Sequence, residues 1–343
     1  MLPYWIAFFL SAFLAFTRVR ISNLGWLILA SLITVFVGLR FEVGGDWYAY
    51  TAWLARSAQL SFLEVFTFQD PGYYLVNWIA ASFGFEVWLV NLFSAAIFSI
   101  GLVAFVKRLP SPMLAIVIAM PYMIIVLAMG YTRQAVAFGF VLWALTYLIQ
   151  NRTLPFILLL SLGAAFHKSA VILVCLAVLA NTKNRAWTFV WVGLSGALLY
   201  WLFLAEQVAG LWSNYVESGY SSEGGPIRVA MNIVPALIYL LFRNRFNFAP
   251  QERALWFWMS IFSLVCLPLV FQASTAVDRV ALYFMPIQLV IFASLPRLVD
   301  HNSRVIVRAS VISFYALVQF VWLNYAKSAF VWLPYQFWPL ANS

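Results

Sequence analysis

Apolar runs recur along this chain from end to end, and most are about 13 to 20 residues long, close to what an α-helix needs to cross a bilayer. Hydrophobic residues make up 65% of the 343 residues and charged residues 9%, a larger apolar fraction than a soluble core can use. These features predict an all-α polytopic integral membrane protein with a single transmembrane domain over residues 1–343. Cys175 and Cys266 each lie inside an apolar run, where a thiol behaves as a small hydrophobe.

The apolar runs predict about 12 transmembrane helices. Met1–Phe16 has no basic leader and no small-residue cleavage site, so we expect a retained first span rather than a signal peptide. Pro71–Gly84 is left out, because a crossing there would reverse the side of Lys107 and Arg108; it is expected to be re-entrant or interfacial. The expected spans are 2–16, 24–39, 86–106, 112–129, 134–149, 153–166, 168–180, 186–205, 229–242, 254–272, 280–296 and 306–323.

With these spans, most of the 20 basic residues fall on one face of the membrane, which receives only Glu252 and Asp300 among the acids. Short cytoplasmic loops are enriched in Lys and Arg, so we expect this face to be cytoplasmic and both termini to lie outside. The net charge of +9 therefore reflects topology and does not indicate nucleic-acid binding. The basic residues of this face are Arg18, Arg20, Lys107, Arg108, Arg152, Lys183, Arg185, Arg243, Arg245, Arg253, Arg297, Arg304 and Arg308.

The other basic residues lie on the outer face, which positive charge usually avoids. They are Arg40, Arg56, Arg133, Lys168, Arg228, Arg279 and Lys327. Four of them begin spans that run inward, namely Arg133, Lys168, Arg228 and Arg279. Each of these four is therefore expected at a helix N-terminus, where the dipole disfavours a cation. Such an N-terminus suits a phosphate, because free N–H groups and a guanidinium converge there. Alternatively, these cations reach lipid headgroups or pair with outer acids, and we assign Arg56 and Lys327 to that role.

His167 lies between two short apolar runs, next to Lys168 and near the outer boundary. A lone histidine in apolar surroundings is commonly structural, but the neighbouring cation and outer placement make it a candidate for proton transfer. His301 lies in a polar cytoplasmic loop and receives no role. No metal-ligand spacing, glycine-rich nucleotide loop or Ser-His-Asp arrangement occurs in the sequence. The expected chemistry needs no metal and no cofactor.

The turn after the second apolar run combines charge, glycine and aromatic rings in Arg40-Phe41-Glu42-Val43-Gly44-Gly45-Asp46-Trp47-Tyr48-Ala49-Tyr50. Aromatic rings suit sugars and polyprenyl chains, although headgroup anchoring produces the same composition. We expect two larger outer loops, about 40–85 and 206–228, to cover a periplasm-facing cavity that is open sideways to lipid.

Six short motifs follow one another along nearly the whole chain. They are Val43-Gly44-Gly45-Asp46-Trp47-Tyr48-Ala49-Tyr50, Asp70-Pro71-Gly72-Tyr73-Tyr74-Leu75-Val76-Asn77, Tyr131-Thr132-Arg133-Gln134-Ala135-Val136-Ala137, Ala165-Phe166-His167-Lys168-Ser169-Ala170, Asp278-Arg279-Val280-Ala281-Leu282-Tyr283-Phe284 and Leu333-Pro334-Tyr335. In this order and on this side of the membrane they resemble the EpsG branch of the Wzy-type polysaccharide repeat-unit polymerases. The chain departs from the family pattern in the Gly44-Gly45 pair and in the loop from Glu206 to Arg228, which matches no family motif.

The resemblance implies a glycosyltransferase of the bacterial inner membrane, with a periplasmic active site, that makes an O-antigen, capsule or exopolysaccharide. Its partners would be membrane lipids and two undecaprenyl-pyrophosphate-linked oligosaccharides, with a chain-length regulator as a further candidate. A hydroxyl of the incoming repeat unit would attack the anomeric carbon at the reducing end of the growing chain, and undecaprenyl pyrophosphate would leave. The main catalytic task would be to neutralise charge developing on the pyrophosphate.

His167 and Asp46 are the candidates for the base that takes the hydroxyl proton. We expect His167 to be the base and Asp46 to orient a hydroxyl or an arginine, with the reverse assignment open. The expected substrate-binding residues are Arg133 and Arg279 at the pyrophosphate, Arg40 and Arg228 at a second phosphate or the acceptor, and Lys168, Tyr50, Tyr131, Gln134, Asp278 and Tyr283 around them. Tyr283 follows Arg279 by four residues, so the two would share a helix face.

Two other functions fit the sequence. A ligase of the O-antigen type would use the same donor but transfer the glycan to a lipid A core. A transporter or flippase for lipid-linked oligosaccharides would instead place ionisable residues at the bilayer midplane and show repeat symmetry. The charges expected here crowd the outer edge.

Overall fold

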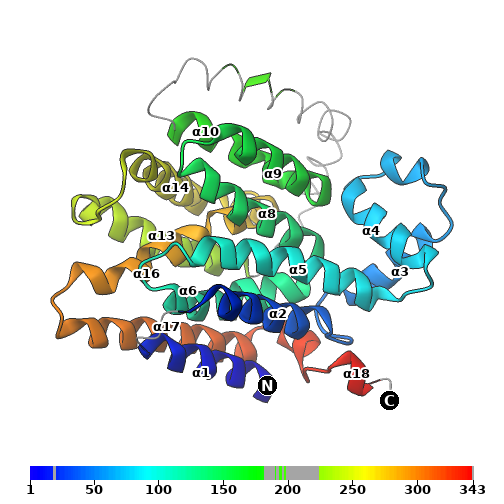
Figure 1. Cartoon of the computed structure of the whole chain (residues 1–343), viewed down its shortest axis with the longest axis horizontal. Helices are drawn as coiled ribbons and strands as arrows, with labels where there is room; N and C mark the ends of the chain where they lie inside the picture. Colours follow the sequence, from blue (N-terminus) through cyan, green and yellow to red (C-terminus); the bar gives the residue numbers. More distant parts are fainter. Residues whose placement is uncertain (18–20, 181–189, 191–192, 195–196, 198–223, 342–343) are drawn as a thin grey trace.

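The computed structural model describes residues 1–17, 21–180, 190, 193–194, 197 and 224–341. This part of the chain is helical throughout (Figure 1), apart from connecting turns and an isolated antiparallel bridge between Arg40 and Phe337. The α-helices are α1 (Leu2–Phe16), α2 (Asn23–Gly38), α3 (Trp47–Ser57), α4 (Pro71–Ser82), α5 (Val87–Val106), α6 (Pro112–Ala119), α7 (Ala128–Gly130), α8 (Thr132–Leu148), α9 (Thr153–Phe166), α10 (Val174–Ala180), α13 (Gly225–Phe242), α14 (Pro250–Leu269), α15 (Ser274–Ala281), α16 (Pro286–Leu298), α17 (Ser303–Tyr325) and α18 (Trp338–Ala341). Shorter segments are the 3₁₀ turns η1 (Glu64–Thr67), η3 (Lys168–Leu173), η6 (Arg243–Arg245), η7 (Leu282–Phe284) and η8 (Ala329–Trp332), and the π-helix η2 (Met120–Leu127).

Several helices are long and apolar enough to cross a bilayer, which confirms the prediction of an all-helical, multi-pass membrane protein. Within the described ranges there are five such stretches, or six if the bent pair Ser274–Phe284 and Pro286–Leu298 forms one broken span. The helices α1, α2 and α9 are apolar but shorter. The expected span 186–205 and residues 206–223 of the expected second outer loop lie outside the described residues, apart from positions 190, 193–194 and 197. The five stretches are Val87–Val106, Pro112–Gly130, Gly225–Arg245, Pro250–Leu269 and Ser303–Tyr325.

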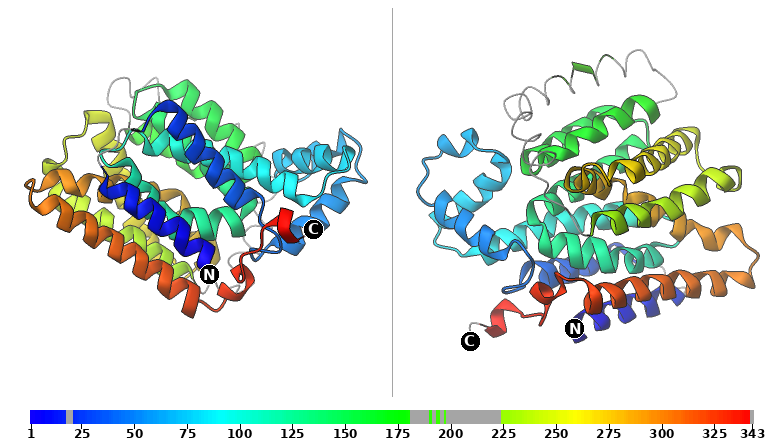
Figure 2. Two further views of the ribbon diagram at one scale, coloured as in Figure 1. Left: turned by 60° about the horizontal axis from the view of Figure 1, so that its bottom comes forward. Right: turned by 180° about the vertical axis from the view of Figure 1, so that it is seen from behind.

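The region 40–85, expected to be a loop, is instead largely helical. The helices α3 and α4 pack against each other and form a lobe that projects from the bundle near the C-terminus (Figures 1 and 2). Pro71 begins α4, where its fixed φ suits a first helical turn and its missing N–H would have had no helical partner. The expected outer loop is therefore built largely of short helices, and its side of the membrane stays a prediction.

The expected span 280–296 is also different in the structure. The helix α15 ends at Ala281, η7 follows, and α16 begins at Pro286, with a bend of 41° between the two halves. A proline at this position cannot donate the hydrogen bond that would continue the preceding helix. Arg279 therefore lies in the last turn of a short helix and not at a helix N-terminus.

The centre of the bundle is tightly packed. On one side α2, α5, α8 and α9 lie side by side, and α5 and α8 cross where Gly101 meets Gly139. A Cβ atom on Gly101 would lie 1.9 Å from the Gly139 carbonyl oxygen, so this crossing requires glycine, which has no side chain. Small residues are common where membrane helices cross closely. Next to it, the span Pro112–Gly130 is wholly buried and contains the π-helix η2. π-Helical segments inside α-helices are frequent at functional sites.

The C-terminal segment ties the turn after α2 to this buried span. Gly44 N–H donates to the carbonyl of Val331 over 2.8 Å, and Trp338 N–H donates to the carbonyl of Leu39 over 2.8 Å. Trp332 Nε1 donates to the carbonyl of Ile125 in η2 over 3.0 Å. The segment that follows α17 therefore fixes the position of the glycine-aromatic turn against the core.

Candidate functional site

The two ends of the bundle carry different loops. At one end Arg297 donates to the carbonyl of Pro110 over 3.3 Å, which joins two of the basic loops expected on the cytoplasmic side. The α3–α4 lobe and both termini lie at the opposite end (Figure 1). The residues predicted to form the site gather at this second end.

Arg133 anchors a group of ionisable residues beside the α3–α4 lobe. Its Nη1 lies 2.7 Å from Oδ2 of Asp70, and its guanidinium carbon lies 4.0 Å from the ring centroid of Trp53. Asp70 is 6% exposed and Arg133 is 25% exposed, so the arginine is held firmly and still reaches the surface. We call the group the Asp46–His167 cluster; its members are Asp46, Asp70, Arg133, His167, Lys168 and Arg279.

Asp46 lies half-buried at the beginning of α3, where the Tyr50 hydroxyl approaches its Oδ2 at 3.4 Å. Burial raises the pKa of the Asp46 carboxyl above its ordinary value, and the charges of Arg133 and Arg279 offset part of that rise. A carboxylate with a raised pKa binds a proton more readily, which suits a general base.

His167 is held in one orientation by the segment that follows it. Its Nδ1 accepts the backbone N–H of Ser169 over 3.4 Å and lies 2.9 Å from the Ser169 hydroxyl. Because a backbone N–H can only donate, Nδ1 carries a lone pair, and the neutral ring then keeps its proton on Nε2. Burial, and after it the charges of Arg279, Arg133 and Lys168, hold the pKa of His167 well below its ordinary value. The ring is therefore neutral and offers an Nε2–H donor.

The predicted residues of α8 and α15 meet beside this cluster. Gln134 Nε2 donates to the carbonyl of Arg279 over 2.9 Å, and the Ser169 hydroxyl contacts the buried Tyr283 hydroxyl at 3.3 Å. Tyr283 belongs to η7, which directly continues α15. Lys168 donates to the side chain of Gln69 over 3.2 Å.

Arg40 is separated from this surface. It is 1% exposed, and Nε and Nη1 donate to the carbonyls of Val43 and Val37. Its Nη2 donates to Asn91 and Thr132. The structure places this arginine in the framework below the turn, which gives no support to the expected contact with a phosphate.

Arg228 and Asp278 form a second buried pair next to the cluster. Arg228, in the first turn of α13, uses Nε and Nη2 to contact both carboxylate oxygens of Asp278. The rings of Tyr122 and Tyr131 lie 5.9 and 6.0 Å from its guanidinium carbon. Asp278 precedes Arg279 in the chain, so this pair adjoins the Asp46–His167 cluster.

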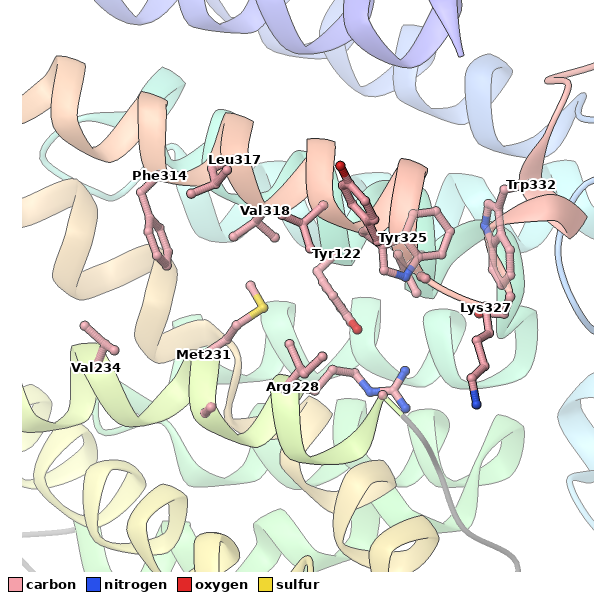
Figure 3. Close-up of a pocket in the computed structure, with 18 of the residues that line it drawn as sticks. Tyr122, Arg228, Met231, Val234, Phe314, Leu317, Val318, Tyr325, Lys327 and Trp332 are labelled. Carbon is pink, nitrogen blue, oxygen red and sulfur yellow. The ribbon is translucent and has the colours of Figure 1, made fainter.

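A cavity of about 1080 Å³ opens beside Arg228, between α13, α17 and η2 (Figure 3). The sequence did not indicate Tyr122, Trp332 or Lys327 as parts of a site, and all three line this cavity. Tyr122 lies inside an apolar run, so nothing local distinguishes it from a core residue. Lys327 was predicted to reach lipid headgroups or to pair with outer acids, and its place on the same cavity as Arg228 depends on the fold of the C-terminal segment.

Two of the site's acids, Asp70 and Asp278, are paired with arginines, and Asp46 lies near the charges of Arg133 and Arg279. Among the residues that the structure describes, no group of three or more His, Cys, Asp or Glu could hold a metal ion. The arrangement can therefore bind an anion through guanidinium groups and move a proton through Asp46.

Comparison with known proteins identifies the family. Searches of curated proteins and of solved structures gave no match. The model of the EpsG family matches residues 23–337, which include every residue of the Asp46–His167 cluster and of the Arg228–Asp278 pair. The chain is a member of the EpsG family.

Proposed function

We propose that this protein polymerises undecaprenyl-pyrophosphate-linked oligosaccharide repeat units at the periplasmic face of the bacterial inner membrane. Membership of the EpsG family supports a polysaccharide-polymerase role and a glycosyltransferase-like activity. The observation that carries the proposal is the Asp46–His167 cluster, in which three cations surround two carboxylates and one neutral imidazole at one end of a bundle of apolar helices.

The proposed reaction forms one glycosidic bond and breaks one bond to phosphate. The oxygen of an acceptor hydroxyl attacks the anomeric carbon of the growing chain, and the bond from that carbon to the pyrophosphate oxygen breaks. The electron pair leaves with undecaprenyl pyrophosphate, and the hydroxyl proton passes to the base. Charge accumulates on the leaving group, where fixed cations stabilise the transition state more than the ground state.

The geometry favours Asp46 as the base, which reverses the assignment expected from the sequence. Since Nδ1 of His167 is occupied by the Ser169 N–H, a neutral ring has no lone pair at Nε2 with which to accept the proton. His167 would instead donate its Nε2–H to an oxygen of the substrate. Arg133 and Arg279 would neutralise the pyrophosphate, and Arg40 would support the turn that carries Asp46.

Complementation of a deletion strain tests this function. A strain without the protein should accumulate single repeat units, because the repeat unit is made and exported but not joined. Arg133→Ala and Arg279→Ala should fail to restore long chains although the protein is inserted normally. Arg56→Ala is the matched control, because Arg56 lies over Phe68 on the exposed side of α3. Long chains still attached to the carrier lipid would indicate a ligase, and repeat units retained on the cytoplasmic side would indicate a flippase.

A conservative substitution separates charge from geometry at Arg133. Arg133→Lys keeps the charge but loses the planar fork that can hold Asp70 and an oxygen anion together. We expect chain length to fall nearly as far as in Arg133→Ala, with Arg56→Lys unaffected. Full activity of Arg133→Lys would show that a point charge is sufficient and that the guanidinium plays no part in recognition.

A further inference from the structure

We propose that the cavity between α13 and α17 holds the first isoprene units of the second polyprenyl pyrophosphate, that of the acceptor, with its pyrophosphate at the end where Arg228 and Lys327 lie. The chemical class of this ligand rests on the proposed function. The location of the site rests on the shape, lining and charge of the cavity.

The size of the cavity excludes a small anion as its whole occupant. At about 1080 Å³ it matches the upper end of pockets for drug-sized ligands, about 300–1,000 Å³. A phosphate or a single sugar would fill a small part of it. A long chain can fill a space of this size.

The lining changes from apolar to cationic along the cavity. Figure 3 shows Phe314, Leu317, Met231 and Val234 at one end of the space between the two helices, and Arg228 at the other. The apolar residues come from α13 and α17, whose outer sides also expose large apolar side chains. The cavity is therefore suited to an amphiphile that lies along the helices with its tail toward the bilayer.

The polar end is built for an anion. Asp278 fixes the position of the buried guanidinium of Arg228 through Nε and Nη2. Gly224 at the beginning of α13 lines the same end, so the first turn of an 18-residue helix adds its dipole there. Lys327 supplies a second cation from the segment after α17. Two cations and a helix N-terminus match a pyrophosphate group.

Photocrosslinking with the full-length protein in lipid nanodiscs tests the location. A benzophenone amino acid in place of Val318, which lines the cavity, should crosslink to added undecaprenyl pyrophosphate. The same amino acid in place of Phe320, an exposed residue two positions along α17, should not. Equal crosslinking at both positions would overturn the proposal. So would crosslinking at Val318 to bulk phospholipid and not to undecaprenyl pyrophosphate.

Direct binding tests the two ends of the cavity separately. Val318→Trp should lower the affinity for undecaprenyl pyrophosphate by roughly tenfold or more, because each buried methylene contributes to binding, whereas Phe320→Trp should not. Lys327→Ala should weaken the binding of undecaprenyl pyrophosphate but not the binding of uncharged undecaprenol. If inorganic pyrophosphate binds as tightly as the lipid and Val318→Trp changes nothing, the site holds only a headgroup and the proposal fails.

These binding measurements need no turnover, so they separate the two proposals. Specific crosslinking at Val318 in a protein whose deletion leaves polymer length unchanged would contradict the proposed function and keep the lipid site. Loss of polymer in Arg133→Ala together with unaltered lipid binding in Val318→Trp would keep the proposed function and contradict the lipid site.

Discussion

At the scale of single residues, charge and position in the chain do not distinguish framework from site. Arg40 and Arg133 both lie on the outer side in the sequence. Arg40 is 1% exposed and committed to four hydrogen bonds within the protein, whereas Arg133 is 25% exposed and pairs with one acid. Position in the chain also does not decide the roles of Asp46 and His167. The backbone N–H of Ser169 determines which nitrogen of the His167 ring holds the proton, which leaves Asp46 as the base.

The pKa shifts of these two residues predict the pH dependence of polymerisation. Asp46 must be ionised to act as a base. Because its pKa is raised above the ordinary aspartate value of 3.8, activity should be lost at a higher pH than for an ordinary aspartate. His167 titrates well below 6.5, so it stays neutral and adds no step near that pH. In proteoliposomes the rate should therefore fall on acidification at a pH above that of an ordinary aspartate, and this loss of rate should disappear in Asp46→Asn together with the activity.

Nitrogen NMR checks the same assignment directly. His167 and His301 are the two histidines of the chain, so His301→Gln leaves a single imidazole to observe. At neutral pH we expect a protonated Nε2 and an unprotonated Nδ1. An imidazolium near pH 6.5, or a proton on Nδ1, would contradict the role given to His167 and restore it as the candidate base.

At the scale of elements, the turn between α2 and α3 is fixed by close approach as well as by hydrogen bonds. Gly44 has a φ of +107°, and a Cβ atom there would lie 2.2 Å from the Met129 carbonyl oxygen. Gly45 faces more open space, with Trp332 at 3.8 Å from such a Cβ. The pair Gly44-Gly45 is thus one required glycine and one tolerant position.

Alanine at each glycine tests this distinction. Gly44→Ala adds a left-handed backbone penalty of about 1–2 kcal/mol and forces the turn away from the end of the buried span. We expect the melting temperature in detergent to fall by a few degrees or more and polymerisation to fall with it, because Asp46 moves. Gly45→Ala should change neither measurement. Equal stability of the two variants would show that the turn adjusts freely.

At the scale of the whole molecule, the helices bring two groups of charged residues to opposite ends of the bundle. The Asp46–His167 cluster, the Arg228–Asp278 pair and the polar end of the cavity share one end with the termini. The loops around Pro110 and Arg297 occupy the other. Segregation of this kind is the outcome of the positive-inside rule in a folded bundle, and it predicts which end faces outward.

Cysteine labelling tests that orientation. With Cys175 and Cys266 replaced by alanine, single cysteines are introduced at Gln59 beside the α3–α4 lobe and at Asn302 in the turn before α17, both exposed. A membrane-impermeant maleimide should label the cysteine at position 59 in cells with a permeabilised outer membrane, and the one at position 302 only after lysis. The opposite pattern would place the cluster in the cytoplasm and contradict a periplasmic site.

The sequence by itself determined the helical membrane class, the helix positions to within a few residues in most cases, and the motifs that carry the site. These follow from local properties, namely apolar run length, charge sidedness and short motifs. The tertiary structure decided which charged groups meet: Arg133 pairs with Asp70 across 63 positions, and Arg228 with Asp278 across 50. It also decided that Lys327 adjoins a cavity and that Arg40 does not reach the surface. Partners so far apart in the chain are selected by helix packing, which no local pattern encodes.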